Sequence, residues 1–267
     1  MKRSSRSGAA ALTLTLALFA PLFAPALAQD MLRGVDLTLP AYSRSDYSRE
    51  EIVALLKAQK PDAPLDLSGK SLNGADLSGL DFSRVNLRAA RLVKTRLSGA
   101  KLDGAILDQA WMLEADLTGA SLVGAHLFSA QLQRARADGA DFSRARIAGD
   151  LTGASLRGAK FREANMAADM KNQSMGLMRA VLASAIAEGA DFTAANLMSA
   201  DLRYLHAAGA DFSGASMQGA DAAGADFTGA KWDGAKVSGL DLDSARIDDD
   251  AAALLKDAKG LGPARAK

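Results

Sequence analysis

A large apolar residue returns at every fifth position through most of the chain. The series starts at Leu67, and the residue two positions before each large one is alanine in most units. The remaining three positions are mainly small or polar. A helix returns to the same face after 3.6 residues and a strand after two, so neither element has this period. A repeat of this extent indicates a solenoid, in which each unit buries its apolar side against its neighbours.

The phase of the repeat changes twice. We call the large residue of each five the central residue. One residue is missing after Ile147, so the next four central residues come one position early. One additional residue within 167–176 restores the phase from Leu177 onward. We therefore expect a solenoid over 65–249 that is irregular at 148–176.

Several units resemble the motif of the pentapeptide-repeat family. Good copies are "ADLSG" at 75–79, "ADLTG" at 115–119 and "ADFSG" at 210–214. The resemblance implies an all-β fold, a right-handed quadrilateral β-helix in which four pentapeptides form one coil. It also implies that the central residue and the alanine point inward. About nine coils at strand spacing, roughly 4.8 Å, would give a rod of roughly 40 Å.

The first 28 residues have the pattern of a secretory leader. Three basic residues precede an apolar stretch, which ends in small residues at Ala26 and Ala28. This order predicts a signal peptide over 1–28, cleaved before Gln29, and therefore a periplasmic or secreted bacterial protein. An uncleaved anchor is the alternative. No later stretch is apolar enough to cross a bilayer, so we expect no membrane span in the mature chain.

The residue pattern of the segment 29–64 predicts a helix that covers the N-terminal end of the solenoid. Over 48–60, Ser48 has the place of an N-cap, and Glu51 completes a capping box with it. A helix here would shield a coil edge that could otherwise pair with another chain. A peptide-binding role for this helix is the alternative.

The segment 250–267 predicts a second covering helix with a tail. Aspartates at 248–250 suit a helix N-terminus, and Gly260 would stop the helix. We expect Leu254 and Leu255 to lie over the last coil.

No constellation of catalytic residues stands out in the chain. His126 and His206 each precede a central residue and should point outward, four coils apart, too far to share a metal. The repeated aspartate before the central residue indicates a role in the turn rather than in acid–base catalysis. No phosphate-binding glycine pattern or Ser–His–Asp set occurs. We predict no enzymatic activity, no bound metal and no cofactor.

The charge of the chain argues against nucleic acid as a partner. Removal of 1–28 takes away three basic residues and changes the formal net charge from +1 to −2. General affinity for nucleic acid needs a basic surface. The resemblance also brings in family members that mimic DNA and inhibit gyrase, but their surfaces are strongly acidic. A DNA-mimicking topoisomerase inhibitor is therefore only our second alternative.

The irregular stretch is rich in methionine. The residues concerned are Met166, Met170, Met175 and Met178. Thioether sulfur binds Cu(I), so a small-ligand or copper-binding module is our first alternative function. We favour the interpretation that flexible methionines fill an irregular interior. Residues 174–189 are either an inserted helix or, as the phase of their alanines favours, an in-register coil with a bulged corner.

Large apolar residues at outward positions form the candidate partner-binding surface. This surface consists of Val93, Ile106, Trp111, Leu113, Phe128 and Arg91. Stacking residues twenty apart places them on two adjoining sides of the solenoid, with Arg91 beside Trp111 for a cation–π contact. Exposed apolar and aromatic groups are typical of interfaces. The alternative is that the chain's own segment 30–47 covers them.

Taken together, these patterns predict an exported, non-enzymatic β-helix that acts as a scaffold or adaptor. Its partner would be an unidentified protein or a second copy of the chain.

Overall fold

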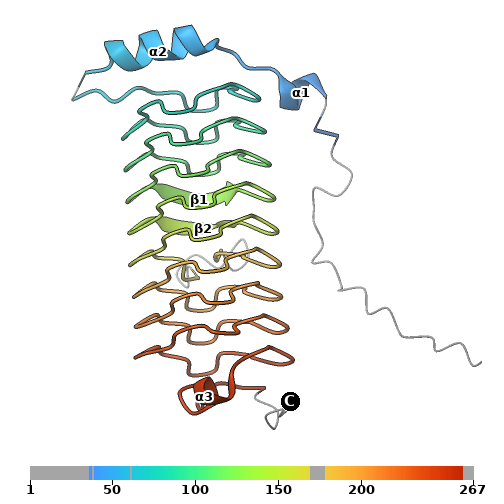
Figure 1. The fold of residues 1–267 in the computed structure, drawn as a ribbon. Coiled ribbons are helices and arrows are strands. Elements are labelled where there is room, and N and C mark those ends of the chain that lie inside the picture. The colour runs from blue at the N-terminus through green and yellow to red at the C-terminus, as the bar shows by residue number, and fades with distance from the viewer. Residues whose placement is uncertain (1–35, 38, 61, 169–177, 261–267) are drawn as a thin grey trace, which may run out of the picture. The chain divides into compact units, whose positions relative to one another are not determined.

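The computed structural model describes residues 36, 37, 39–60, 62–168 and 178–260. These residues form stacked coils with short helices at the two ends (Figure 1). The helices and strands are α1 (Pro40–Ser43), α2 (Arg49–Ala58), β1 (His126–Gln131), β2 (Arg146–Asp150) and α3 (Asp249–Ala252). The residues from Met1 to Val35, with the predicted signal peptide, lie outside the described part. Among the described residues, none of the helices is sufficiently long and apolar to cross a membrane.

Parallel bridges between residues one coil apart build the column of coils. Asp66 pairs with Asn86, and this ladder continues through nine residues to Lys236. Most bridges are single residue pairs that stand just before a central residue. The strands β1 and β2 are a more extended parallel pair within the same ladder. Four ladders of this kind give each coil four sides, as the predicted fold class requires.

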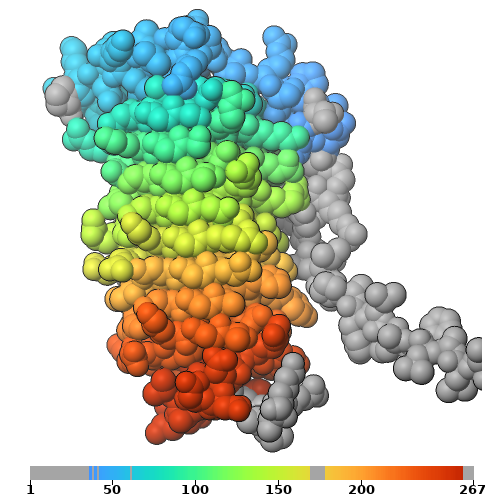
Figure 2. All heavy atoms as spheres, in the orientation of Figure 1, coloured from blue at the N-terminus to red at the C-terminus, as the bar shows by residue number. Residues whose placement is uncertain are grey.

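We number the four faces by the first central residue that each one buries. These residues are Leu67 on face 1, Leu72 on face 2, Leu77 on face 3 and Phe82 on face 4. The prediction that Leu117, Leu122 and Leu127 lie on three successive inner faces is confirmed, since each side chain is 0% exposed. The coils lie directly on one another along the column (Figure 2).

Stacked rings fill part of the interior of face 4. The rings of Phe142, Phe161, Phe192 and Phe212 follow one another at centroid distances of 5.0, 4.8 and 4.9 Å and are within 4° of parallel. Each of these side chains is 0% exposed. Burial of a side chain of this size contributes roughly 1.5–3 kcal/mol, so the repeat supplies a continuous apolar core.

The repeated aspartate holds the corner of the coil, as expected. The Oδ1 atom of Asp66 accepts a hydrogen bond from the N–H of Ser68 at 2.9 Å, and Asp81 accepts one from Ser83 at 2.9 Å. The bond joins the residue before the central one to the residue after it. The next residue then takes a positive φ, for example 67° at Gly69. A carboxylate here therefore stabilises the turn.

The same bonds predict that acid destabilises the fold. The backbone N–H of Ser68 lowers the pKa of Asp66, and the side chain of Ser83 lowers the pKa of Asp81, both from 3.8. When the native pKa lies below the unfolded one, the stabilisation is complete above the unfolded pKa and is lost as the pH falls through the native pKa. We expect a constant melting temperature from about pH 7 to 5 and a decline below about pH 4.

Circular dichroism melts between pH 7 and pH 2 measure this effect. A variant with Asp66→Asn and Asp81→Asn keeps both acceptor oxygens but cannot titrate, so it should lose less over the acid range. A wild-type melting temperature that stays constant down to pH 2 would contradict the assignment.

The missing residue of the repeat removes one corner. Arg136 pairs with Ser155, nineteen residues later rather than twenty. The residue lost is the one with positive φ, so β2 continues in an extended course through Gly149 to Asp150. Gly149 is buried, and a Cβ atom built on it would lie 2.6 Å from the carbonyl oxygen of Ala130. Glycine is therefore required where the shortened coil crosses its neighbour.

The insertion is longer than the one residue predicted. Asp150 pairs with Val181, 31 residues later, so eleven residues are additional to a regular coil. Eleven is two fives plus one, which is why the phase alone indicated a single residue. Residues 178–189 contain no helix, so the inserted helix over 174–189 is wrong for this part, and Ala180 and Ala185 are buried in register. The predicted central residue Leu177 lies outside the described residues.

The N-terminal cover has the predicted helix. Ser48 caps α2, and the capping box is complete: the N–H of Glu51 donates to Ser48 Oγ, and the N–H of Ser48 donates to Glu51 Oε2. Ile52 is 0% exposed within the core. Arg49 donates to the carbonyl oxygens of Asp76 and Ser78 at 2.7 and 2.9 Å. The helix thus satisfies acceptors on the edge of the first coil.

The C-terminal cover is only partly as predicted. Leu255 is 0% exposed, but Leu254 is 55% exposed, so only one of the two leucines packs on the last coil. Helix α3 ends at Ala252, which means that Gly260 does not stop it. The physical reason is that the following chain pairs with the coil edge: the N–H of Leu242 donates to the carbonyl oxygen of Lys259 at 2.9 Å.

Candidate functional site

Faces 3 and 4 are largely neutralised by ion pairs between successive coils. On face 3, Arg96 lies 2.8 Å from Asp76 and Arg246 lies 3.0 Å from Asp226. On face 4, comparable pairs join Lys160 with Asp141, Arg162 with Asp191 and Lys231 with Asp211. Exposed pairs of this type contribute little stability, at most about 1 kcal/mol each. They do leave these two faces with few unpaired charges for a partner.

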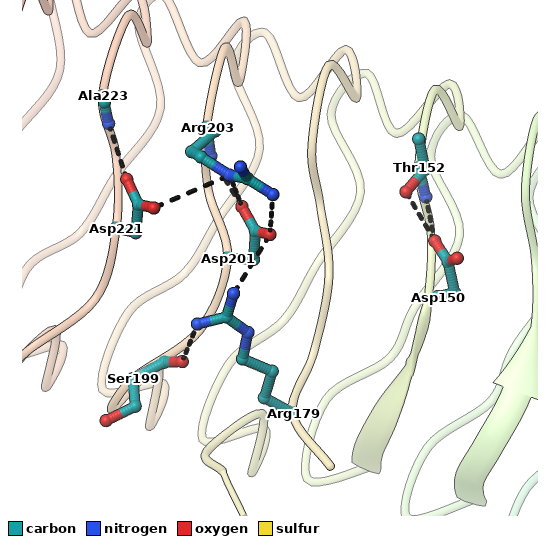
Figure 3. Close-up of polar contacts among 8 residues, drawn as sticks. All are labelled: Asp150, Thr152, Arg179, Ser199, Asp201, Arg203, Asp221 and Ala223. Carbon is teal, nitrogen blue, oxygen red and sulfur yellow. Dashed lines mark hydrogen bonds and ion pairs between the residues drawn. The ribbon is translucent and has the colours of Figure 1, made fainter. Parts of the chain in front are cut away.

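Face 2 holds a buried charge network at the point where the insertion ends (Figure 3). Asp201 is 2% exposed and accepts hydrogen bonds from Arg203 at 2.7 Å and from Arg179 at 3.2 Å. Arg179 also donates to the carbonyl oxygen of Ser199. Burial raises the pKa of Asp201, but the hydrogen bonds and charges of the two arginines outweigh it and keep the pKa below its ordinary value. The network fixes the chain where it re-enters the column.

The same face disproves part of the predicted partner surface. Val93 and Leu113 are 0% and 1% exposed, so neither presents an apolar side chain to solvent. The ring of Tyr42 stacks on Trp111 at 6.3 Å with an interplanar angle of 14°, which leaves Trp111 40% exposed. Arg91 precedes Trp111 by one coil, as predicted, but the ring contact that the described residues show for Trp111 is the one with Tyr42.

The chain's own N-terminal segment lies along face 2. Ser45 forms an antiparallel bridge with Leu72. The N–H of Asp46 donates to the carbonyl oxygen of Ser71, and the N–H of Ser71 donates to Asp46 Oδ2, both at 2.7 Å. These bonds hold residues 39–47, which we call the cover segment, along the first coils. Self-coverage by 30–47, the alternative considered from the sequence, therefore applies to face 2 for the described residues 39–47; residues 30–35 and 38 lie outside the described part.

Face 1 differs from the other three faces in its exposed apolar side chains and its unpaired polar side chains. Phe128 is 39% exposed and Met198 is 41% exposed, and Ile106 is half-buried. In the described part of the chain, Arg88 with Asp108 is the ion pair of this face, at 3.1 Å. The remaining outward positions carry neutral or unpaired side chains.

On face 1, the basic side chains of His126 and Arg146 have no partner among the described residues. His126 and Arg146 occupy successive levels of the ladder, and both are exposed. Their side chains make neither a hydrogen bond nor an ion pair with any described residue. Face 1 therefore combines exposed apolar side chains with uncompensated positive charge.

A hollow of about 630 Å³ opens on face 1 between Phe128 and Met198. Its apolar lining includes Ala148, Ala167 and Ala168. The hollow has a cause in the repeat: the coil has lost its corner residue after Ala148. Small side chains at these levels leave room that larger polar ones fill elsewhere.

Met198 was not included in the candidate surface from the sequence, although its position in the repeat is unusual for an apolar residue. It follows the central residue Leu197, a position that is polar in most units. Met198 lies on the same face as Phe128, and this placement is known only once Asn165 is paired with Asn196, 31 residues later. Because the length of the insertion could not be determined from the five-residue phase, Met198 could not be assigned to the face of Phe128 from the sequence.

The histidines and methionines form no site in the described residues. His206 lies on face 3 and not four coils beyond His126 on the same face, because the deletion and the insertion change the coil count. No group of three or more potential ligands among His, Asp and Glu is placed to hold a metal in the described ranges. Met166 is 0% exposed in the interior and Met178 is half-buried, whereas Met170 and Met175 lie outside the described residues.

Comparison with known proteins identifies the repeat. A family model described as pentapeptide repeats matches in 8 copies, which fall within 71–144, 147–167 and 177–248. The longer unmatched gap, 168–176, falls within the insertion. None of the curated proteins matches the chain significantly.

Several solved structures are similar to the chain. One is HetL from the cyanobacterium Nostoc sp. strain PCC 7120, a pentapeptide repeat protein involved in heterocyst differentiation regulation; it is 32% identical over 69% of this chain and 77% of its own, with a TM-score of 0.33. QnrB1, a plasmid-mediated fluoroquinolone resistance protein, is 19% identical over 68% and 95%, with a TM-score of 0.41. Rfr23 from the cyanobacterium Cyanothece 51142 is 16% identical over 78% and 97%, with a TM-score of 0.31.

Proposed function

Because the chain belongs to the pentapeptide-repeat family, we propose that it is an exported, non-enzymatic scaffold that binds another protein through face 1. Proteins of this family are in general structural or interaction proteins rather than enzymes. The proposal concerns the side of the column, where outward residues vary from coil to coil while the interior stays constant.

The observation that carries the proposal is the contrast between face 1 and its neighbours. Faces 3 and 4 pair their charges between coils, and the cover segment lies along face 2. Face 1 instead exposes Phe128 and Met198 beside a hollow. Apolar side chains rimmed by polar ones are typical of protein interfaces. A rigid column needs no rearrangement to present them, which reduces the entropic cost of binding.

Export rests on the leader pattern of residues 1–28, which predicts a mature chain that begins at Gln29. It also determines where a partner is to be sought, namely in the periplasmic or secreted fraction.

Affinity capture from that fraction tests the proposal. Tagged wild type should retain a partner, and the double variant Phe128→Ser/Met198→Ser should retain at least about tenfold less, because its exposed apolar anchors are gone. The melting temperature should change little, since both side chains point outward. The intact mass of the recovered protein should place Gln29 at its N-terminus.

The matched control is Ile186→Ser, which removes an outward apolar side chain from face 3. Capture by this variant should equal that of wild type. If the partner is a second copy of the chain, light scattering should give a lower assembly mass for the double variant but not for Ile186→Ser. Equal capture by the wild type and the double variant would refute a role for face 1.

A further inference from the structure

The hollow of face 1 combines an apolar floor with charge of one sign. Ala148, Ala167 and Ala168 line it, and Phe128 and Met198 flank it. Such a floor can bury a large apolar side chain, and that burial contributes roughly 1.5–3 kcal/mol.

Among the described residues that line the hollow, Arg146 is the cation, and most of the other polar side chains are neutral. Arg146 and His126 line it and have no partner among the described residues. Among the described residues that line the hollow, Asp108 is the one carboxylate, and it is already engaged: it lies 3.1 Å from Arg88 and accepts the N–H of Phe128 at 3.1 Å. Asn165 and Asn196 accept the N–H groups of Ala167 and Met198 in their own turns. Among the described residues, the charge left for a ligand is therefore the positive charge of Arg146.

The length of the hollow fits a short extended peptide. Phe128, Ala148, Ala167 and Met198 occupy four successive levels of face 1. Three steps at strand spacing, roughly 4.8 Å each, span roughly 14 Å, which an extended chain covers in about four residues at roughly 3.4 Å per residue.

From these observations we infer that face 1 recognises an acidic peptide segment in which a large apolar residue stands within about four residues of Asp or Glu. The apolar side chain occupies the hollow over the alanines, and the carboxylate pairs with Arg146. An arginine–carboxylate pair gives direction to the peptide as well as attraction. This inference rests on the proposed function, because it specifies the partner of the same face.

Selection from a random 12-residue peptide display library on the immobilised mature protein tests it. Peptides that also bind the double variant Phe128→Ser/Met198→Ser are removed by counter-selection. The enriched sequences should contain an aromatic or large aliphatic residue close to Asp or Glu. Enrichment of basic sequences, or no enrichment over the double variant, would overturn the inference.

The best selected peptide is then synthesised and titrated by fluorescence anisotropy. Arg146→Glu should weaken binding by at least about tenfold, because it reverses the charge that meets the carboxylate. Lys236→Glu is the matched control: it makes the same charge change on the same face, at a residue that does not line the hollow, and should change the affinity less than about twofold. Equal effects of the two variants would overturn the assignment of Arg146.

The two proposals fail differently. If capture of the partner depends on Phe128 and Met198 but the selected peptides show no acidic preference, face 1 remains the interface and the inferred ligand chemistry is wrong.

Discussion

Replacing Phe192 with alanine is expected to lower the free energy of unfolding by about 3–5 kcal/mol. Phe192 is 0% exposed, and its ring stacks on Phe161 at 4.8 Å and on Phe212 at 4.9 Å. Truncation removes the buried ring and leaves a cavity between two neighbours that belong to different coils and are held by backbone bridges. The ladder restrains these coils, so they cannot collapse freely into the gap.

Chemical denaturation followed by circular dichroism measures the loss. Phe192→Leu is the control, because leucine is the commonest central residue of this column and fills most of the volume. Its cost should stay below about 1.5 kcal/mol. A loss for Phe192→Ala as small as that of Phe192→Leu would show that the ring stack does not stabilise the column as argued.

Replacing Gly149 with alanine is expected to lower the free energy of unfolding by about 2–3 kcal/mol, although it adds only one methyl group. The Cβ atom would lie 2.6 Å from the carbonyl oxygen of Ala130 and 3.2 Å from that of Leu127. Both oxygens belong to the backbone of the adjoining strand β1, so no side-chain rotation relieves the collision. The two coils would have to separate where the repeat has lost its corner.

Gly158→Ala separates this collision from the ordinary cost of losing a glycine. Gly158 stands at a regular corner with φ of 60°, and a Cβ atom there meets nothing within 4 Å. Ala89 and Ala194 already occupy equivalent corners with φ of 53° and 56°. The control should cost about 1 kcal/mol, from backbone strain alone. Equal losses for the two variants in the same denaturation experiment would contradict the crowding at Gly149.

Local signals allowed the covering helix and the corner to be predicted. The capping box at Ser48 and Glu51 involves residues three apart, and the aspartate of each corner bonds two residues ahead. Both depend on groups close in sequence, so no knowledge of the rest of the fold was needed. The C-terminal cover was predicted less well, because the chain after Ala252 pairs with a coil edge that the local pattern does not include.

The candidate site was predicted only in part. Phe128 and Ile106 were recognised as outward apolar residues of one face, and Phe128 is exposed there. Met198 was not associated with them, since its neighbourhood depends on a 31-residue spacing. Val93 and Leu113 were assigned to the surface because their positions in the repeat face outward, yet both are buried.

The sequence by itself determined the five-residue period, the inward residues and the phase on either side of the irregular stretch, because each follows from positions within one or two units. Only the tertiary structure decided which coils are neighbours across the insertion and which outward residues meet solvent. Whole additional units of five do not change the phase of the repeat, so insertions of one and of eleven residues shift the phase equally. The exposure of an outward position, in turn, depends on chain that is not part of the repeat, as where Tyr42 stacks on Trp111.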